Sequence, residues 1–107
     1  MIMDRGPSED AGAGFAPDVD NACWTYAGPL TYANAGTVLA AVVELSLPTS
    51  GEVDLTDVEA IDSAAVAVLI ALKRRAAVEG RSLSFSHIPP SLAALADLYG
   101  VNDMLVA

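Results

Sequence analysis

The sequence predicts a small α/β domain whose mixed, largely parallel sheet is covered by packed helices. First, β-favouring segments alternate with segments of helical period, in the order β-α-β-α-β-α. Second, 53% of the residues are apolar but only 6% are aromatic, which is typical of Ala, Val and Leu packed between helices and a sheet. Third, Pro48 and residues 80–86 separate the helical segments at βαβ distances, which disfavours the alternative of a small helical bundle.

The N-terminal part of the chain differs in composition from the rest. Residues 1–20 combine Gly, Pro, Ser and acidic residues without apolar periodicity, so we expect a flexible acidic tail followed by a domain over residues 21–107. Residues 22–27 carry Trp, Thr and Tyr and end at Gly28-Pro29, which predicts the first strand.

Two further elements follow before the centre of the chain. Apolar residues recur at helical spacing over residues 32–47, and Pro48 ends this pattern, which predicts a helix. Residues 52–55 alternate as a short strand does, and we expect residues 56–61 to form a turn into the next helix.

The second predicted helix runs from Ser63 to Glu79 and ends at Gly80. Ser63 is its predicted N-cap, with the charge of Asp62 beside the positive helix end. The apolar stripe is so wide that we expect most of the first half to be buried. The basic triplet at residues 73–75 either forms a solvated helix end or presents charge at the rim of a partner interface.

The last two elements have clear boundaries in the sequence. Residues 83–86 read as a strand. Pro90 is suited to the first position of a helix over residues 91–99, and Gly100 ends it.

Composition excludes several classes of function. The chain carries 14 acidic and 5 basic side chains, a net charge of −9, which repels phosphate backbones and argues against nucleic-acid binding. Cys23 is the only cysteine, which excludes an intrachain disulfide and suits the cytoplasm. No apolar run reaches about 18 residues and no signal sequence is present, so we expect neither membrane insertion nor secretion.

The polar residues do not form a recognisable catalytic or metal-binding pattern. His87 has no second His or Cys at ligand spacing. Asp54 and Asp57 are two neighbouring carboxylates, but no nucleophile, base and orienting group converge on them in the sequence. We therefore expect no catalytic residue, no metal site and no cofactor.

The centre of the chain resembles a known family. The pattern D-L-(S/T), a short hydrophobic turn, and D-(S/T)-x-G-(L/V) opening a helix is the central motif of STAS domains, the fold of anti-sigma factor antagonists. This sequence is similar at Asp54-Leu55-Thr56 and at Ile61-Asp62-Ser63. Residues 91–105 look like the last helix and tail of the MlaB type, the small cytoplasmic STAS subunit of an ABC system that moves phospholipids between bacterial membranes.

The resemblance spans roughly residues 24–105 and implies a STAS-like fold and a non-enzymatic accessory function. The implied partner is a MlaF-like ABC transporter ATPase, and through it a membrane permease at the inner face of the inner membrane. The position of Ser63 is phosphorylated in the antagonists and lies at the ATPase contact in the MlaB type. A partner-binding role is therefore implied for Asp62, Ser63, Ala64 and Ala65.

Three departures from the family pattern favour docking over a phosphorylation switch. Ala65 stands where the family has Gly, and Pro29 and Thr31 replace two acids expected in phosphorylatable antagonists. The alternative is an anti-sigma factor antagonist regulated by phosphorylation at Ser63. The family's usual first strand is expected to be shortened or lost within the acidic tail.

The C-terminal part adds one more candidate contact residue. Leu98 and Tyr99 are followed by further apolar residues, and in so small a domain such residues pack on the domain or meet a partner. We expect Leu98 to pack on the domain and Tyr99 to contact the partner.

Overall fold

Four strands form one sheet in the order β1-β2-β3-β4 in this computed structural model, which describes residues 13–101. Strand β1 (Gly14–Pro17) is antiparallel to β2 (Cys23–Leu30). Strands β2, β3 (Glu52–Ile61) and β4 (Ser84–Ser86) are parallel to one another. The small, mixed and largely parallel sheet predicted from the sequence is confirmed.

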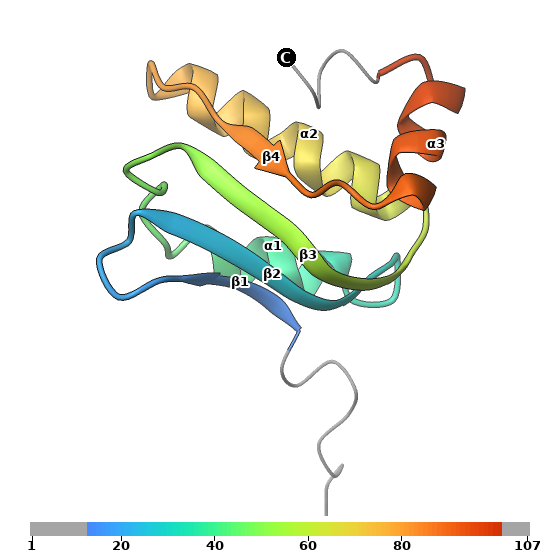
Figure 1. The fold of residues 1–107 in the computed structure, drawn as a ribbon, viewed down its shortest axis with the longest axis horizontal. Helices are drawn as coiled ribbons and strands as arrows, with labels where there is room; N and C mark the ends of the chain where they lie inside the picture. Colours follow the sequence, from blue (N-terminus) through green and yellow to red (C-terminus); the bar gives the residue numbers. More distant parts are fainter. Residues whose placement is uncertain (1–12, 102–107) are drawn as a thin grey trace, which may run out of the picture.

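The helices lie between the parallel strands and after them. Helix α1 (Ala35–Val42) connects β2 to β3, and α2 (Ser63–Val78) connects β3 to β4. Both crossovers step in the same direction along the sheet, so a common right-handed connection puts both helices on one face, and Figure 1 shows them behind the strands. Helix α3 (Pro90–Leu98) packs beside α2. No helix in the described part of the chain is long and apolar enough to cross a bilayer.

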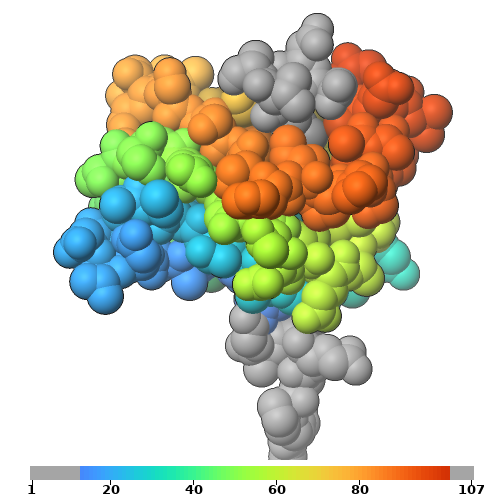
Figure 2. Space-filling model, viewed as in Figure 1, coloured from blue at the N-terminus to red at the C-terminus, as the bar shows by residue number. Residues whose placement is uncertain are grey.

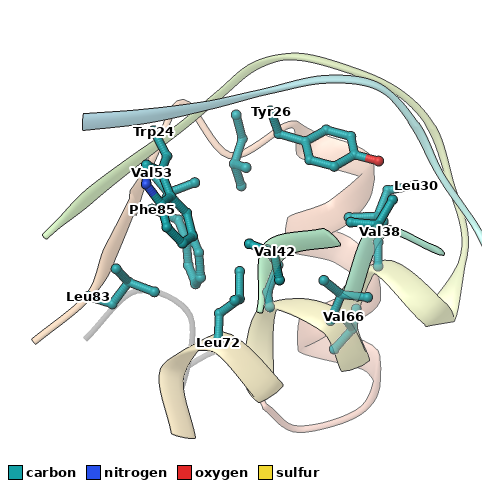
Figure 3. Packing of buried hydrophobic residues seen from close by; sticks show 14 of the residues in the cluster. Trp24, Tyr26, Leu30, Val38, Val42, Val53, Val66, Leu72, Leu83 and Phe85 are labelled. Carbon is teal, nitrogen blue, oxygen red and sulfur yellow. The ribbon is translucent and has the colours of Figure 1, made fainter. Parts of the chain in front are cut away.

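The core lies between the sheet and the helices because alternate strand residues point toward α1 and α2. Trp24, Tyr26 and Val53 are fully buried. Figure 3 shows these side chains facing Val42 and Leu72 from the two helices. The intervening residues of the strands point to the opposite face of the sheet.

The first strand of the sheet lies in the segment predicted to be a flexible tail. Residues Gly14–Pro17 pair with β2, so the prediction is wrong over this segment; residues 1–12 lie outside the described part. The Phe15 ring packs on Tyr26, with ring centroids 4.7 Å apart, and on Trp24, at 5.8 Å. Two aromatic contacts of one ring and one row of backbone pairing thus hold a strand that has no apolar periodicity of its own.

Replacing Phe15 with alanine should lower the free energy of unfolding by about 1–2 kcal/mol, because a half-buried ring loses its contacts with two aromatic neighbours. Urea denaturation measures this change. Val19 is 98% exposed in the turn after β1, so Val19→Ala is the matched control. Equal stability of the Phe15→Ala variant and the control would show that β1 does not contribute to the core.

Two other predicted boundaries are corrected by the structure. The turn predicted over residues 56–61 is the second half of β3, which stays paired to β2 through register shifts, with Leu30 opposite Ile61. These shifts interrupt the alternation that marks a strand in sequence. Helix α1 is shorter than the predicted residues 32–47 at both ends. Residues 31–34 form a hydrogen-bonded turn before it, and the N–H groups of Glu44 and Leu45 bond three residues back instead of four, which ends it.

Candidate functional site

The start of α2 and the loop after β2 meet at one end of the sheet. The carboxyl ends of neighbouring parallel strands lie at the same sheet edge, and β2 and β3 end opposite each other at Leu30 and Ile61. The backbone N–H of Tyr32 donates a hydrogen bond of 3.0 Å to Oδ2 of Asp62. We call residues 31–34 and 62–64 the Asp62 corner. Figure 2 shows atoms from both segments at the same end of the molecule.

Asp62, rather than Ser63, caps the N-terminus of α2. Its Oδ1 accepts a hydrogen bond of 2.8 Å from the N–H of Ala64, and its backbone carbonyl accepts one from Ala65. Ser63 is the first helical residue. The predicted N-cap at Ser63 is therefore wrong by one residue. Asp62 and Ser63 are both good capping residues, so the sequence does not decide between them. Strand β3 ends at Ile61, and Asp62 keeps the extended backbone that an N-cap residue requires.

The four predicted contact residues around the helix start differ in exposure. Ser63 is exposed, while Asp62 and Ala64 are partly buried. Ala65 is fully buried in the core, so its side chain cannot form the predicted partner contact. The helical turn directs residue 65 inward, and its extra methyl group relative to glycine fills space inside the domain rather than at its surface.

The loop before α1 is held in place by a buried asparagine. Asn34 is only 3% exposed; its Oδ1 accepts a hydrogen bond from the N–H of Thr31 and its Nδ2 donates to the carbonyl of Pro29, both at 2.9 Å. The hydroxyl of Tyr26 donates to the same carbonyl at 2.6 Å. Both functional groups of the buried amide thus find partners, which fixes the loop.

Tyr32 is the residue of this corner that the sequence interpretation missed. Its side chain is 85% exposed beside the helix start, whereas the sequence placed it inside the first helix. One signal was available: neighbouring parallel strands end at the same sheet edge, so the residues just after β2 had to lie near Asp62.

The predicted C-terminal contact residues lie at the end of α3. Tyr99 follows the helix and is 53% exposed, as a contact residue would be. Leu98 is 75% exposed, so its predicted packing on the domain is wrong. None of the interactions recorded among residues 13–101 connects Tyr99 to the Asp62 corner.

Two of the three basic residues near the end of α2 act within the domain. Arg75 donates from Nη1 to the carbonyl of Val42 at 3.1 Å and from Nη2 to that of Leu45. The Lys73 ammonium lies 5.8 Å from the centre of the Phe85 ring, and burial lowers its pKa. The guanidinium of Arg75 is thus used to hold α1, and neither proposed surface role describes it.

Asp54, Thr56 and His87 form a separate polar cluster away from the Asp62 corner. Oδ1 of Asp54 accepts hydrogen bonds from Oγ1 of Thr56 at 2.6 Å and from its N–H at 2.9 Å, and it lies 3.1 Å from Nδ1 of His87. The bonds from Thr56, with a smaller contribution from His87, hold the pKa of Asp54 below its ordinary value of 3.8. Within residues 13–101, no three potential metal ligands gather in one place.

Asp54 should make the stability of the domain depend on pH in the acid range. The pKa of Asp54 is lower in the folded chain than in the unfolded chain. Its ionised side chain therefore stabilises the fold fully above about pH 3.8, and this stabilisation is lost as the pH falls through the lowered pKa. We expect Asp54→Asn to flatten the decline in the free energy of unfolding on acidification, measured by urea denaturation. Asp57→Asn removes an exposed carboxylate from the same strand and is the control. A decline in Asp54→Asn as steep as that of the parent chain would contradict this prediction.

The comparison with protein families covers most of the chain. Residues 25–107 match the model of a family described as "Mlab, STAS domain". The match begins within β2 and contains the whole Asp62 corner. A comparison with the curated proteins found no match.

Proposed function

Because the chain belongs to the Mlab, STAS domain family, we propose that it is a non-enzymatic accessory subunit of an ABC transporter that moves phospholipids. Membership of this family supports a small regulatory or accessory role in general, and STAS domains are generally binding modules rather than catalysts. In the proposal, the chain binds the cytoplasmic ATPase subunit and stabilises its active assembly. It reaches the membrane permease only through that subunit.

The observation that carries the proposal is the exposure of Ser63 on a rigid corner. Ser63 occupies the first position of α2, with the cap of Asp62 behind it and the hydrogen-bonded loop of residues 31–34 at its side. Because the backbone of both segments is held by hydrogen bonds, little conformational entropy is lost when a partner docks there. Such a surface supports constitutive binding.

The charges around the corner favour docking over the phosphorylation alternative. The helix-start amides of Ala64 and Ala65 are already bonded to Asp62, whose carboxylate would stand next to a phosphate on Ser63. Arg74 is the exposed base of α2, but it lies eleven residues, about 16 Å, along the helix. A phosphate on Ser63 would therefore be repelled by the carboxylate of Asp62, and Arg74 is too far along the helix to compensate.

The test is binding to the purified ATPase subunit of the phospholipid-type ABC transporter from the same organism. We expect Ser63→Arg and Ala64→Arg to reduce affinity by about 100-fold in calorimetry, because a long charged side chain blocks the docking surface. Ser46→Arg, at an exposed serine beyond the opposite end of α1, is the control. Circular dichroism confirms folding of each variant.

Two outcomes would overturn the proposal. One is the absence of binding by the parent chain. The other is undiminished binding by both folded arginine variants, which would remove the corner from the interface. A mass increase at Ser63 after incubation with an anti-sigma factor kinase and ATP would favour the phosphorylation alternative.

A further inference from the structure

Tyr32 presents a large ring to solvent at the Asp62 corner. The side chain is 85% exposed, although a single exposed ring is common and by itself indicates nothing. Tyrosine is, however, enriched among the few residues that dominate binding energy in protein interfaces. Whether an exposed ring can act in this way depends on how firmly its backbone is held.

The backbone of Tyr32, just after β2, is held by Asp62, just after the neighbouring strand β3. The two oxygens of this carboxylate serve different segments: Oδ2 accepts from the N–H of Tyr32 at 3.0 Å, and Oδ1 accepts from the N–H of Ala64 at 2.8 Å. Each oxygen is therefore engaged within the domain. The carboxylate fixes the position of Tyr32 relative to the exposed Ser63.

The loop is also supported from its other side. Thr31 donates its N–H to Oδ1 of the buried Asn34, and the N–H of Ala33 donates to Oγ1 of Thr31 at 3.2 Å. The residues on both sides of Tyr32 are thus hydrogen-bonded within the turn. A ring presented on a fixed backbone loses little conformational entropy on binding, which strengthens an interface contact.

The charges nearby define the chemistry of the partner. Asp57 and Glu59 are exposed in the part of β3 that leads to Asp62, so three acids fall within residues 57–62. Of the bases in the described part, Arg75 and Arg81 donate to backbone carbonyls at the end of α1 and in the segment after it. The strand that leads into the corner is therefore acidic on its exposed side, and basic groups on the part of the partner that lies along this strand would complement it.

We propose that Asp62 is a positioning residue that locks residues 31–34 onto the start of α2, and that Tyr32 is the anchor of the docking surface. The partner is a protein whose contact surface has an apolar recess for the Tyr32 ring and basic side chains on the side that faces β3. This inference rests on the proposed function, since it identifies the contacts by which the ATPase subunit is bound. It reassigns Asp62 from a partner contact to a support for one.

The proposed link from Asp62 to residues 31–34, called the lock below, is tested without any partner by amide hydrogen exchange of the ¹⁵N-labelled full chain. Asp62→Asn leaves one acceptor oxygen for two amides, so we expect exchange of either the Tyr32 or the Ala64 amide to accelerate roughly tenfold. The Asn side chain is a good helix cap, so we expect Tyr32 to be the amide that loses protection. Asp57→Asn removes a nearby charge and should change neither amide. Unchanged exchange of both amides in Asp62→Asn would overturn the lock.

The anchor is tested by calorimetric titration with the same purified ATPase subunit. Tyr32→Ala should weaken binding by about 30-fold or more, whereas Tyr32→Phe keeps the ring and should stay within about threefold. Val43→Ala removes another exposed apolar side chain, beyond the last residue of α1, and should leave affinity unchanged. Asp62→Asn should weaken binding by about tenfold, because the ring is no longer held in position.

The outcomes separate this inference from the proposed function. If the parent chain binds, Ser63→Arg does not, and Tyr32→Ala binds as the parent does, the anchor is wrong while the function stands. If the parent chain does not bind, the function and the anchor both fall, and amide exchange still decides the lock. If Tyr32→Ala and Val43→Ala weaken binding equally, the effect belongs to general apolar surface and the anchor is wrong.

Discussion

Replacing Gly51 with alanine is expected to lower the free energy of unfolding by about 3 kcal/mol or more, enough to unfold a marginal domain. Gly51 has a φ of +75°, and a Cβ atom there would lie 2.6 Å from the carbonyl oxygen of Ser82. The backbone cannot move away easily. Gly51 donates its N–H to Pro48 at 3.0 Å and accepts from Ser84 at 2.7 Å, and these bonds hold the start of β3.

Gly36 provides the matched control for this prediction. It lies in α1 with open space where a Cβ atom would be, so Gly36→Ala should be neutral or stabilise the chain by up to about 1 kcal/mol. Urea denaturation of both variants gives the comparison. A Gly51→Ala variant as stable as Gly36→Ala would mean that the loop before β3 adapts to the added methyl group.

Removing the guanidinium of Arg75 is expected to cost about 2–3 kcal/mol of stability. It donates to the carbonyls of Val42, at the end of α1, and of Leu45, just after it, and Nε also donates to Glu79 one turn along α2. In Arg75→Ala the Leu45 carbonyl loses the donor described for it, and the Val42 carbonyl keeps only the bond from the N–H of Leu45. In Arg75→Lys we expect less than half of the loss to be recovered, because one ammonium does not reproduce a planar group that spans two carbonyls.

Arg74→Ala is the control that separates the loss of the Arg75 hydrogen bonds from the loss of a positive charge on α2. Arg74 is exposed on the same helix, and Arg74→Ala should change stability by no more than about 0.5 kcal/mol. Thermal and urea denaturation of the three variants give the ranking. If Arg75→Lys were as stable as the parent, the positive charge rather than the forked geometry would be responsible.

Much of the fold could be predicted because its main boundaries depend on local sequence. Helix α2 ends before Gly80 and α3 begins at Pro90, where single residues impose the boundary. Strand β1 could not be found in this way. It has only four residues, with Gly14 and Pro17 at its ends, and its place is decided by pairing with β2 and by the contact of Phe15 with rings further along the chain.

The candidate site was found only in part for the same reason. The adjacent Asp62 and Ser63 identified a helix start, but which of them caps it depends on where β3 ends. The bond from Tyr32 to Asp62 spans 30 residues, so no local pattern indicates it. Likewise, the sequence alone does not show that Arg75 is turned toward α1 rather than toward solvent.

The contacts of Asp62 and Arg75 together have a mechanical consequence. Asp62 ties the beginning of α2 to the turn that precedes α1, and Arg75 ties its later part to the carbonyls at the end of α1. The two attachments are about 20 Å apart along α2, so the helices are braced against each other at both ends. A force applied at Ser63 would therefore move the domain as a rigid body, with little change in the arrangement of α1 and α2.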